Sequence, residues 1–120
     1  MRKTIAFLLP AACLFWYACG SSAEEHKKGP VDAAAIFASQ CSMCHDVQQD
    51  KIGPALTGVK ARWANDLTTL KQFIKNNQSV IASGHPYAAA LYQKWHQSNM
   101  PQFTALSDEE IDALIAYFPE

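Results

Sequence analysis

The sequence of 120 residues contains no apolar run of the length, about 20 residues, that a membrane-spanning helix needs. Its most apolar stretch, residues 5–18, is interrupted by Pro10 and follows the basic residues Arg2 and Lys3. A basic start before a short apolar run is typical of an export signal. We therefore interpret residues 1–19 as a signal peptide and the polar residues 20–30 as a flexible tether.

Two fates of this signal are compatible with the residues at its end. Cleavage near Ala18 or Ala23 would release a protein without an anchor. Alternatively, the segment ACGSS at residues 18–22 resembles a bacterial lipoprotein signal with lipid on Cys19, although two aromatic residues before it depart from that pattern. Either fate places the remaining domain in the periplasm or on the outer face of a bacterial membrane.

Cysteine is scarce beyond the signal, and the charge is nearly balanced. Of the four cysteines, Cys41 and Cys44 alone lie after residue 20, and they are too close together to form a disulfide framework. The net charge is −1 and no basic patch is visible, which argues against nucleic acid as a partner. The length allows one domain, which we assign to residues 31–120.

Helical periodicity dominates this domain, and no segment has the alternation of a strand. Ser107 and Glu110 fit a capping box at the start of the last helix, and Pro119 ends it. Apolar loop residues such as Ile52 and Phe103 need a large apolar group to pack on. We predict an all-α fold of about four helices, at residues 31–44, 66–76, 86–97 and 108–118.

The most specific motif is CSMCH at residues 41–45. Two thiols three positions apart on one helical turn can each bond to a vinyl group on the same porphyrin edge. The histidine that follows then lies under the ring, where its imidazole can bind the iron. We therefore predict one covalently attached haem c, held through Cys41 and Cys44, with His45 as a metal ligand.

Two other classes of protein use a Cys-x-x-Cys pair. A thiol redox motif is expected in a thioredoxin-like βαβ setting, which this sequence does not show. A zinc site would need two more ligands, and His85 and His96 do not have a familiar zinc spacing relative to Cys41 and Cys44.

The iron of a haem has a second axial position. The candidates outside the signal are Met43, Met100, His26, His85 and His96. Met100 lies immediately before Pro101 in a predicted loop, which is an unusual place for a methionine that only fills a core. Met43 lies between the two cysteines and cannot reach the opposite face of the ring. We assign Met100 as the sixth ligand and His96 as the alternative.

The ring of His45 also needs a partner for its second nitrogen. The rigid Gly53-Pro54 turn can aim the carbonyl of Pro54 at that nitrogen. An ordinary turn without this role is the alternative.

With these residues in place, the sequence resembles the class I monohaem cytochromes c over residues 31–118. The resemblance rests on the segments 33–45, 53–56, 99–101 and 114–118. It implies the small cytochrome c fold, in which the first and last helices cross, with Phe37 near Tyr117. It also implies that His45 and Met100 bind the iron, and that Pro54 accepts a hydrogen bond from His45.

The same resemblance implies that Trp63 binds a haem propionate, with a purely packing role as the alternative. It further implies that Lys60 and Arg62 can balance propionate charge. At the helix crossing, the family often has glycine where this chain has Ala33, so the contact is expected to be slightly looser.

The function implied is electron transfer in a bacterial respiratory chain, by a carrier or relay subunit without catalysis of its own. Residues 77–91 resemble small bacterial cytochromes that are lipid-anchored or fused to respiratory complexes. The partners would be redox proteins, either a respiratory complex or a terminal reductase or oxidase. They would dock at the exposed haem edge, with orientation by Lys51, Lys60, Lys71, Lys75 and Lys94. A haem enzyme or a gas sensor is the alternative, and it requires an open sixth position.

Overall fold

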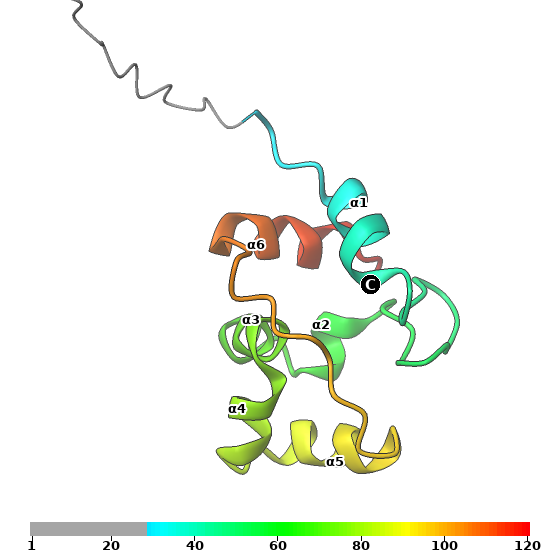
Figure 1. Cartoon of the computed structure of the whole chain (residues 1–120), viewed down its shortest axis with the longest axis vertical. Coiled ribbons are helices and arrows are strands. Elements are labelled where there is room, and N and C mark those ends of the chain that lie inside the picture. Colours follow the sequence, from blue (N-terminus) through cyan, green and yellow to red (C-terminus); the bar gives the residue numbers. More distant parts are fainter. Residues whose placement is uncertain (1–28) are drawn as a thin grey trace, which may run out of the picture.

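The computed structural model describes residues 29–120, and these residues contain helices and no strand (Figure 1). In chain order the elements are α1 (Ala33–Ile36), the π-helical segment η1 (Phe37–Cys41), α2 (Val59–Arg62), α3 (Leu67–Lys75), α4 (Asn77–Ala82), α5 (Pro86–Lys94) and α6 (Asp108–Tyr117). No helix in this part of the chain is long and apolar enough to cross a membrane. The predicted signal, the lipid site at Cys19 and most of the tether lie outside the described residues.

Helix α6 forms as its sequence predicts. The Ser107 hydroxyl accepts a hydrogen bond from the Glu110 backbone N–H at 3.2 Å, and the Glu110 carboxylate accepts one from the Ser107 N–H at 2.8 Å. These bonds satisfy backbone donors that a helix N-terminus leaves without partners. The apolar stripe of the helix then buries Ile111, Leu114 and Ile115.

The first and last helices cross, as predicted. Helix α1 packs against α6 at one end of the molecule (Figure 1). The ring of Phe37, one residue beyond α1, lies 6.1 Å from the ring of Tyr117 and 5.7 Å from that of Phe118, centroid to centroid. These contacts fix the direction in which the chain enters the cysteine motif.

Two short helices, α2 and α4, are not among the four that the sequence predicts. Helix α4 starts directly after α3 because Asn76, with φ −157°, leaves helical geometry and then caps the new helix. Its side chain accepts a hydrogen bond from Ser79 N–H at 3.2 Å, an interaction that favours a helix start. Helix α2 is a single turn that precedes the buried residue Trp63.

Two predicted boundaries are wrong. The first helix changes to a π-helical turn and ends at Cys41, not at residue 44. Helix α5 ends at Lys94 because His96 and Gln97 have positive φ angles of 57° and 60°, which a right-handed helix cannot contain. This left-handed pair turns the chain away from α5 and into the loop that carries Met100.

The remaining helices form a second group beside the α1–α6 pair. Helix α3 packs on both α4 and α6, and α4 packs on α5, so α5 lies at the end of the molecule opposite α1 (Figure 1). The most buried apolar residues are Val59, Trp63, Leu70, Val80, Ala88, Ile111, Leu114, Ile115 and Phe118. They come from α2 to α6 and from the residues that directly follow α2 and α6, and the α1–η1 segment packs on this core through Ile36 and Phe37.

Candidate haem site

A cavity of about 390 Å³ opens inside the helical shell, within the size range of cofactor sites. The six residues that the sequence predicts for cofactor binding all line it: Cys41, Cys44, His45, Pro54, Trp63 and Met100. Most of the other lining side chains are apolar or aromatic, and they come from both helical groups. The cavity therefore suits a large, flat and mainly apolar group.

The ring of His45 is fixed by its own loop. Its Nδ1 lies 2.9 Å from the carbonyl oxygen of Pro54, so the ring donates this hydrogen bond from Nδ1 and keeps Nε2 available as a metal ligand. Gly53 packs directly against the ring, and a Cβ at this position would lie 2.4 Å from Cε1 of His45. Only glycine leaves room for the imidazole here.

Hydrogen bonds across the 46–57 loop hold the Pro54 carbonyl in place. Gly53 N–H donates to the carbonyl of Cys44 at 2.8 Å, and Leu56 N–H donates to that of Asp46 at 3.0 Å. The Arg62 guanidinium donates to the carbonyls of Ala55 and Thr57. Arg62, the last residue of α2, therefore ties the end of the 46–57 loop to that helix.

Cys41 and Cys44 are free thiols that line the cavity on one turn of chain. The backbone N–H groups of Cys44 and His45 both donate to the carbonyl of Cys41, at 3.1 and 2.9 Å. Burial raises the pKa of the Cys41 thiol.

The structure separates the candidates for the sixth ligand. Met100 is partly buried and lines the cavity, on the loop between α5 and α6. Met43 is 79% exposed. His96 is also exposed and does not line the cavity, and His85 caps α5 through a 3.3 Å hydrogen bond from Ala88 N–H to its Nδ1. His26 lies outside the described residues.

From residue 29 onward, no cluster of three or more His, Cys, Asp or Glu side chains could hold a metal ion. The zinc alternative requires such a cluster around Cys41 and Cys44. His85 instead stacks on Trp63, with ring centroids 5.2 Å apart.

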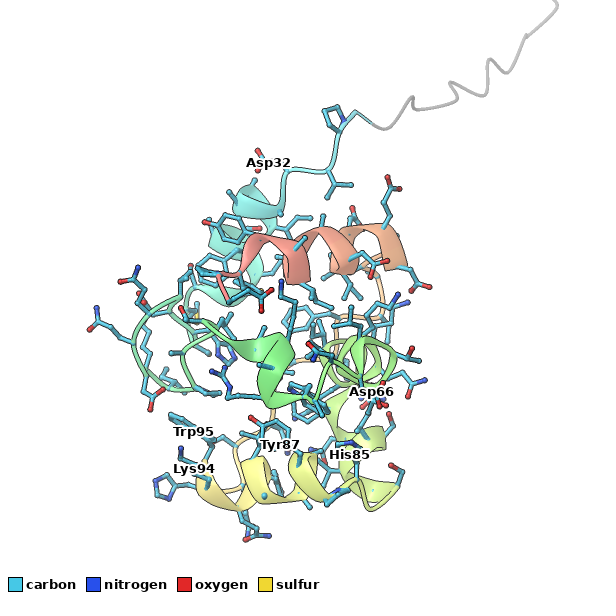
Figure 2. The ribbon with its side chains drawn as sticks, turned by 180° about the vertical axis from the view of Figure 1, so that it is seen from behind. Asp32, Asp66, His85, Tyr87, Lys94 and Trp95 are labelled. Carbon is cyan, nitrogen blue, oxygen red and sulfur yellow. The ribbon has the colours of Figure 1, made fainter. Side chains whose placement is uncertain are left out.

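Two buried polar atoms were missed by the sequence analysis. Trp95 Nε1 and Asn77 Oδ1 are the buried side-chain nitrogen and oxygen atoms in the described region that have no hydrogen-bond partner, and both residues line the cavity. Trp95 lies where α5 ends, on the side facing the rest of the domain (Figure 2). Buried polar atoms normally have hydrogen-bond partners. We therefore expect the molecule that fills the cavity, or water bound beside it, to supply an acceptor for Trp95 Nε1 and a donor for Asn77 Oδ1. In the sequence, Trp95 looked like one more member of an apolar stripe.

Trp63 is in different surroundings. It is 5% exposed and contacts the rings of Phe73, His85 and Tyr87, at centroid distances of 4.8, 5.2 and 5.1 Å. This aromatic cluster joins α2, α3 and α5. It favours the packing role that the sequence left open for Trp63.

The predicted surface lysines are mostly engaged. Lys60 pairs with Glu120, Lys71 with Asp112 and Lys75 with Asp108. Lys51 donates to the carbonyl of Ser42 at 2.6 Å, and the Lys94 ammonium lies 5.7 Å from the centroid of the Trp95 ring. Three of the five lysines are therefore paired with carboxylates, whereas Lys51 and Lys94 have no acidic partner among the described residues.

The residues present fit a covalently bound haem. Two thiols and an oriented imidazole line one end of a mainly apolar cavity, and the buried Trp95 Nε1 donor, which has no partner within the protein, can donate to a haem propionate. The family model for cytochrome c matches residues 31–118.

The chain belongs to the cytochrome c family.

Solved structures agree with this assignment. The cytochrome c domain of the pp3183 protein from Pseudomonas putida is 33% identical, with a TM-score of 0.59, and the match covers 72% of this chain and 83% of that one. A cytochrome c from Rhodothermus marinus is 27% identical, with a TM-score of 0.57, covering 71% of this chain and 69% of that one. No curated protein matches the chain.

This cytochrome c has the small all-α fold of its family and binds one haem c covalently, for which Cys41, Cys44 and His45 form the attachment motif. Class I monohaem architecture fits all of these features. Haem-based electron transfer is the activity of the family, whose members are typically carriers rather than enzymes. Cytochrome c domains typically work outside the cytoplasm, in the periplasm or on the outer face of a membrane.

Proposed function

We propose that this cytochrome c carries electrons in a bacterial respiratory chain, with His45 and Met100 as the axial ligands of its haem. One observation carries the proposal: both residues line the cavity that also receives Cys41 and Cys44. The bound iron supplies the one-electron chemistry, alternating between Fe(II) and Fe(III).

The side chains of the cavity adjust that chemistry toward a high reduction potential. The thioether of Met100 is a soft ligand, which favours the reduced iron. The apolar lining disfavours the additional positive charge of the oxidised iron. With His45 and Met100 both bound to the iron, the protein would leave no position there for a substrate, which suits a carrier.

We assign the hydrogen bond to a propionate to Trp95 rather than to Trp63. The support is the buried Nε1 of Trp95, which has no partner within the protein and lines the cavity. Trp63 instead provides the wall of the site through its aromatic cluster. A donor next to a propionate stabilises its ionised form and lowers its pKa.

The redox partner would approach the edge at which Cys41 and Cys44 attach the haem. Met43 and Ile52 line the cavity there, yet they are 79% and 59% exposed, so this edge presents apolar surface to solvent. Because the five lysines expected to steer the partner are mostly engaged, we expect a small, short-lived contact with weak dependence on ionic strength.

We further propose that the protein is held at the membrane surface by lipid on Cys19. Mass spectrometry of the native protein tests this, since a mature N-terminus at any residue other than Cys19 would refute the anchor.

The ligand assignment is tested by visible spectra of protein matured in a periplasm, oxidised and reduced, with and without carbon monoxide. We expect a c-type reduced spectrum, a Met–Fe(III) charge-transfer band and no shift with carbon monoxide. Met100→Ala should remove the band and allow carbon monoxide to bind, whereas His96→Ala should change neither. A carbon monoxide shift in the wild-type protein would instead indicate a haem enzyme or gas sensor.

A further inference from the structure

The loop that carries Met100 contains no helix, so its shape depends on contacts with other segments. On one side, Gln97 and Ser98 donate backbone hydrogen bonds to the carbonyls of Tyr92 and Trp95, at 2.8 and 3.0 Å. On the other side, Phe103 N–H donates to the carbonyl of Lys75 at 2.9 Å. Residues 99–102 span the interval between these attachments.

Pro101 limits the backbone conformations that the residue before it can adopt. The residue before a proline is confined to extended conformations, so the backbone of Met100 has little freedom of its own. Ser98 is held by its bond to the carbonyl of Trp95, the residue after α5. The main remaining freedom is therefore at Asn99, directly before Met100.

Asn99 receives a hydrogen bond from another part of the protein. The side-chain Nε2 of Gln78 donates to Oδ1 of Asn99. Gln78 lies in the first turn of α4, next to Asn77, which is 2% exposed and lines the same cavity as Met100. Helix α4 is itself packed between α3 and α5, so it is a firm support for the loop.

We propose that Gln78 is a positioning residue that holds Met100 on the iron by fixing Asn99. The inference rests on the proposed ligation by Met100 and deepens it. When the Gln78–Asn99 bond is intact, it limits movement of the loop and so slows the dissociation of Met100. When it is absent, the loop samples more conformations, and Met100 dissociates more often.

The amide chemistry of this pair allows a matched set of variants. Gln78→Glu keeps the bond, because the Asn99 amide can turn and donate to the new carboxylate, and Asn99→Asp keeps it with Gln78 as donor. The double variant Gln78→Glu/Asn99→Asp places two carboxylates together and removes the bond. Gln78→Met removes it without a charge.

The control has the same charge change as the double variant. Gln72 is exposed on α3, so Gln72→Glu/Asn99→Asp adds two negative charges while retaining the Gln78–Asp pair. Thermal unfolding of every variant checks that the fold is intact.

The experiment measures the rate at which saturating imidazole displaces the native ligand from the oxidised protein, which reports Met100 dissociation. Stopped-flow absorbance of the charge-transfer band gives this rate. The loss of one hydrogen bond predicts exchange about threefold to tenfold faster in Gln78→Met and in Gln78→Glu/Asn99→Asp. Both single acidic variants and the Gln72→Glu/Asn99→Asp control should stay within about twofold of wild type.

The possible failures are distinguishable. Equal exchange rates in all variants, with a normal charge-transfer band, would overturn the role of Gln78 and leave the ligand assignment intact. A wild-type protein without that band would overturn both. A control as fast as the double variant would mean that charge, not the hydrogen bond, governs exchange, and it would also overturn the proposal.

Discussion

His45 and Met100 line the same cavity, yet the segments that carry them are held in different ways. Around His45, the stabilising bonds join residues close in sequence: Cys41 with His45, and His45 with Pro54. Around Met100, the local backbone bonds of Gln97 and Ser98 are supplemented by attachments to α3 and α4, more than 20 residues away, through the Lys75–Phe103 and Gln78–Asn99 hydrogen bonds.

The two ligand-bearing segments should therefore differ in how easily their hydrogen bonds are lost when the protein is destabilised. A short loop closes at a small entropic cost and reforms quickly, whereas a contact between distant segments depends on the packing of the whole domain. We therefore expect the Met100 side to open before the His45 side when the protein is destabilised, because low-stability segments open first.

The largest effect should come from a substitution next to His45, whose segment is held by bonds between residues close in sequence. Gly53→Ala places a Cβ 2.4 Å from Cε1 of His45, which must displace the ring and lengthen its 2.9 Å hydrogen bond to Pro54. We expect the free energy of unfolding of the holoprotein to fall by about 1–3 kcal/mol, with most of the covalent haem lost during maturation. Denaturant titration and the haem content per protein measure the two effects.

Gly29→Ala is the control, because a Cβ at residue 29 would meet nothing within 4 Å. If Gly53→Ala matched it in both measurements, the close packing of residue 53 against His45 would not matter.

The two tryptophans provide a second way to sharpen the comparison, since Trp63 follows the His45 loop and Trp95 precedes the Met100 loop. Trp95→Phe removes the buried Nε1 donor, so the propionate that it stabilises should have a higher pKa and the free energy of unfolding should fall by about 1–3 kcal/mol. The pH dependence of the reduction potential reports the propionate. Trp63→Phe should disturb packing and leave that pH dependence in place; the reverse pattern would return the role to Trp63.

Residues with a left-handed backbone conformation follow the His45 loop and precede Met100. Substituting one residue at each place by glycine compares the backbone strain there. Ala64 has φ 52° and His96 has φ 57°, a conformation that alanine adopts less readily than histidine. Ala64→Gly should raise the free energy of unfolding by about 0.5–1 kcal/mol, while the change for His96→Gly should be close to zero. Thermal and urea unfolding of both variants measure this difference, and a larger gain at residue 96 would contradict it.

The smallest effect is expected far from both ligands, at Asp66. Its pKa is lowered from 3.8, mainly by hydrogen bonds from the backbone and side chain of Thr69 and to a lesser extent by His85, which α5 brings near it (Figure 2). A lowered folded-state pKa stabilises the protein above pH 3.8, and this contribution disappears as the pH falls through the folded-state value. Asp66→Asn keeps a cap on α3 but cannot ionise, so its acid unfolding should depend less steeply on pH.

The charge-transfer band of Asp66→Asn at neutral pH should equal that of wild type. An altered band would show that this cap is coupled to the Met100 side.

The sequence by itself determined the parts of this protein that depend on neighbours along the chain. The motif at residues 41–45 specifies covalent haem because its geometry is that of one helical turn, and Ser107 with Glu110 specifies the start of α6 for the same reason. Helix α4 was missed although Asn76 has the residue type of a cap, because its six residues are too few to show a helical period.

Only the tertiary structure decided the parts that depend on distant segments. It distinguished Trp95, whose Nε1 is buried without a partner, from Trp63, whose ring packs against Phe73, because the atoms around each ring come from distant segments. It paired Lys71 with Asp112, and it brought the side chain of Gln78 to that of Asn99. Such contacts follow from the packing of α3 on α4 and on α6, which the local periodicity of the sequence does not encode.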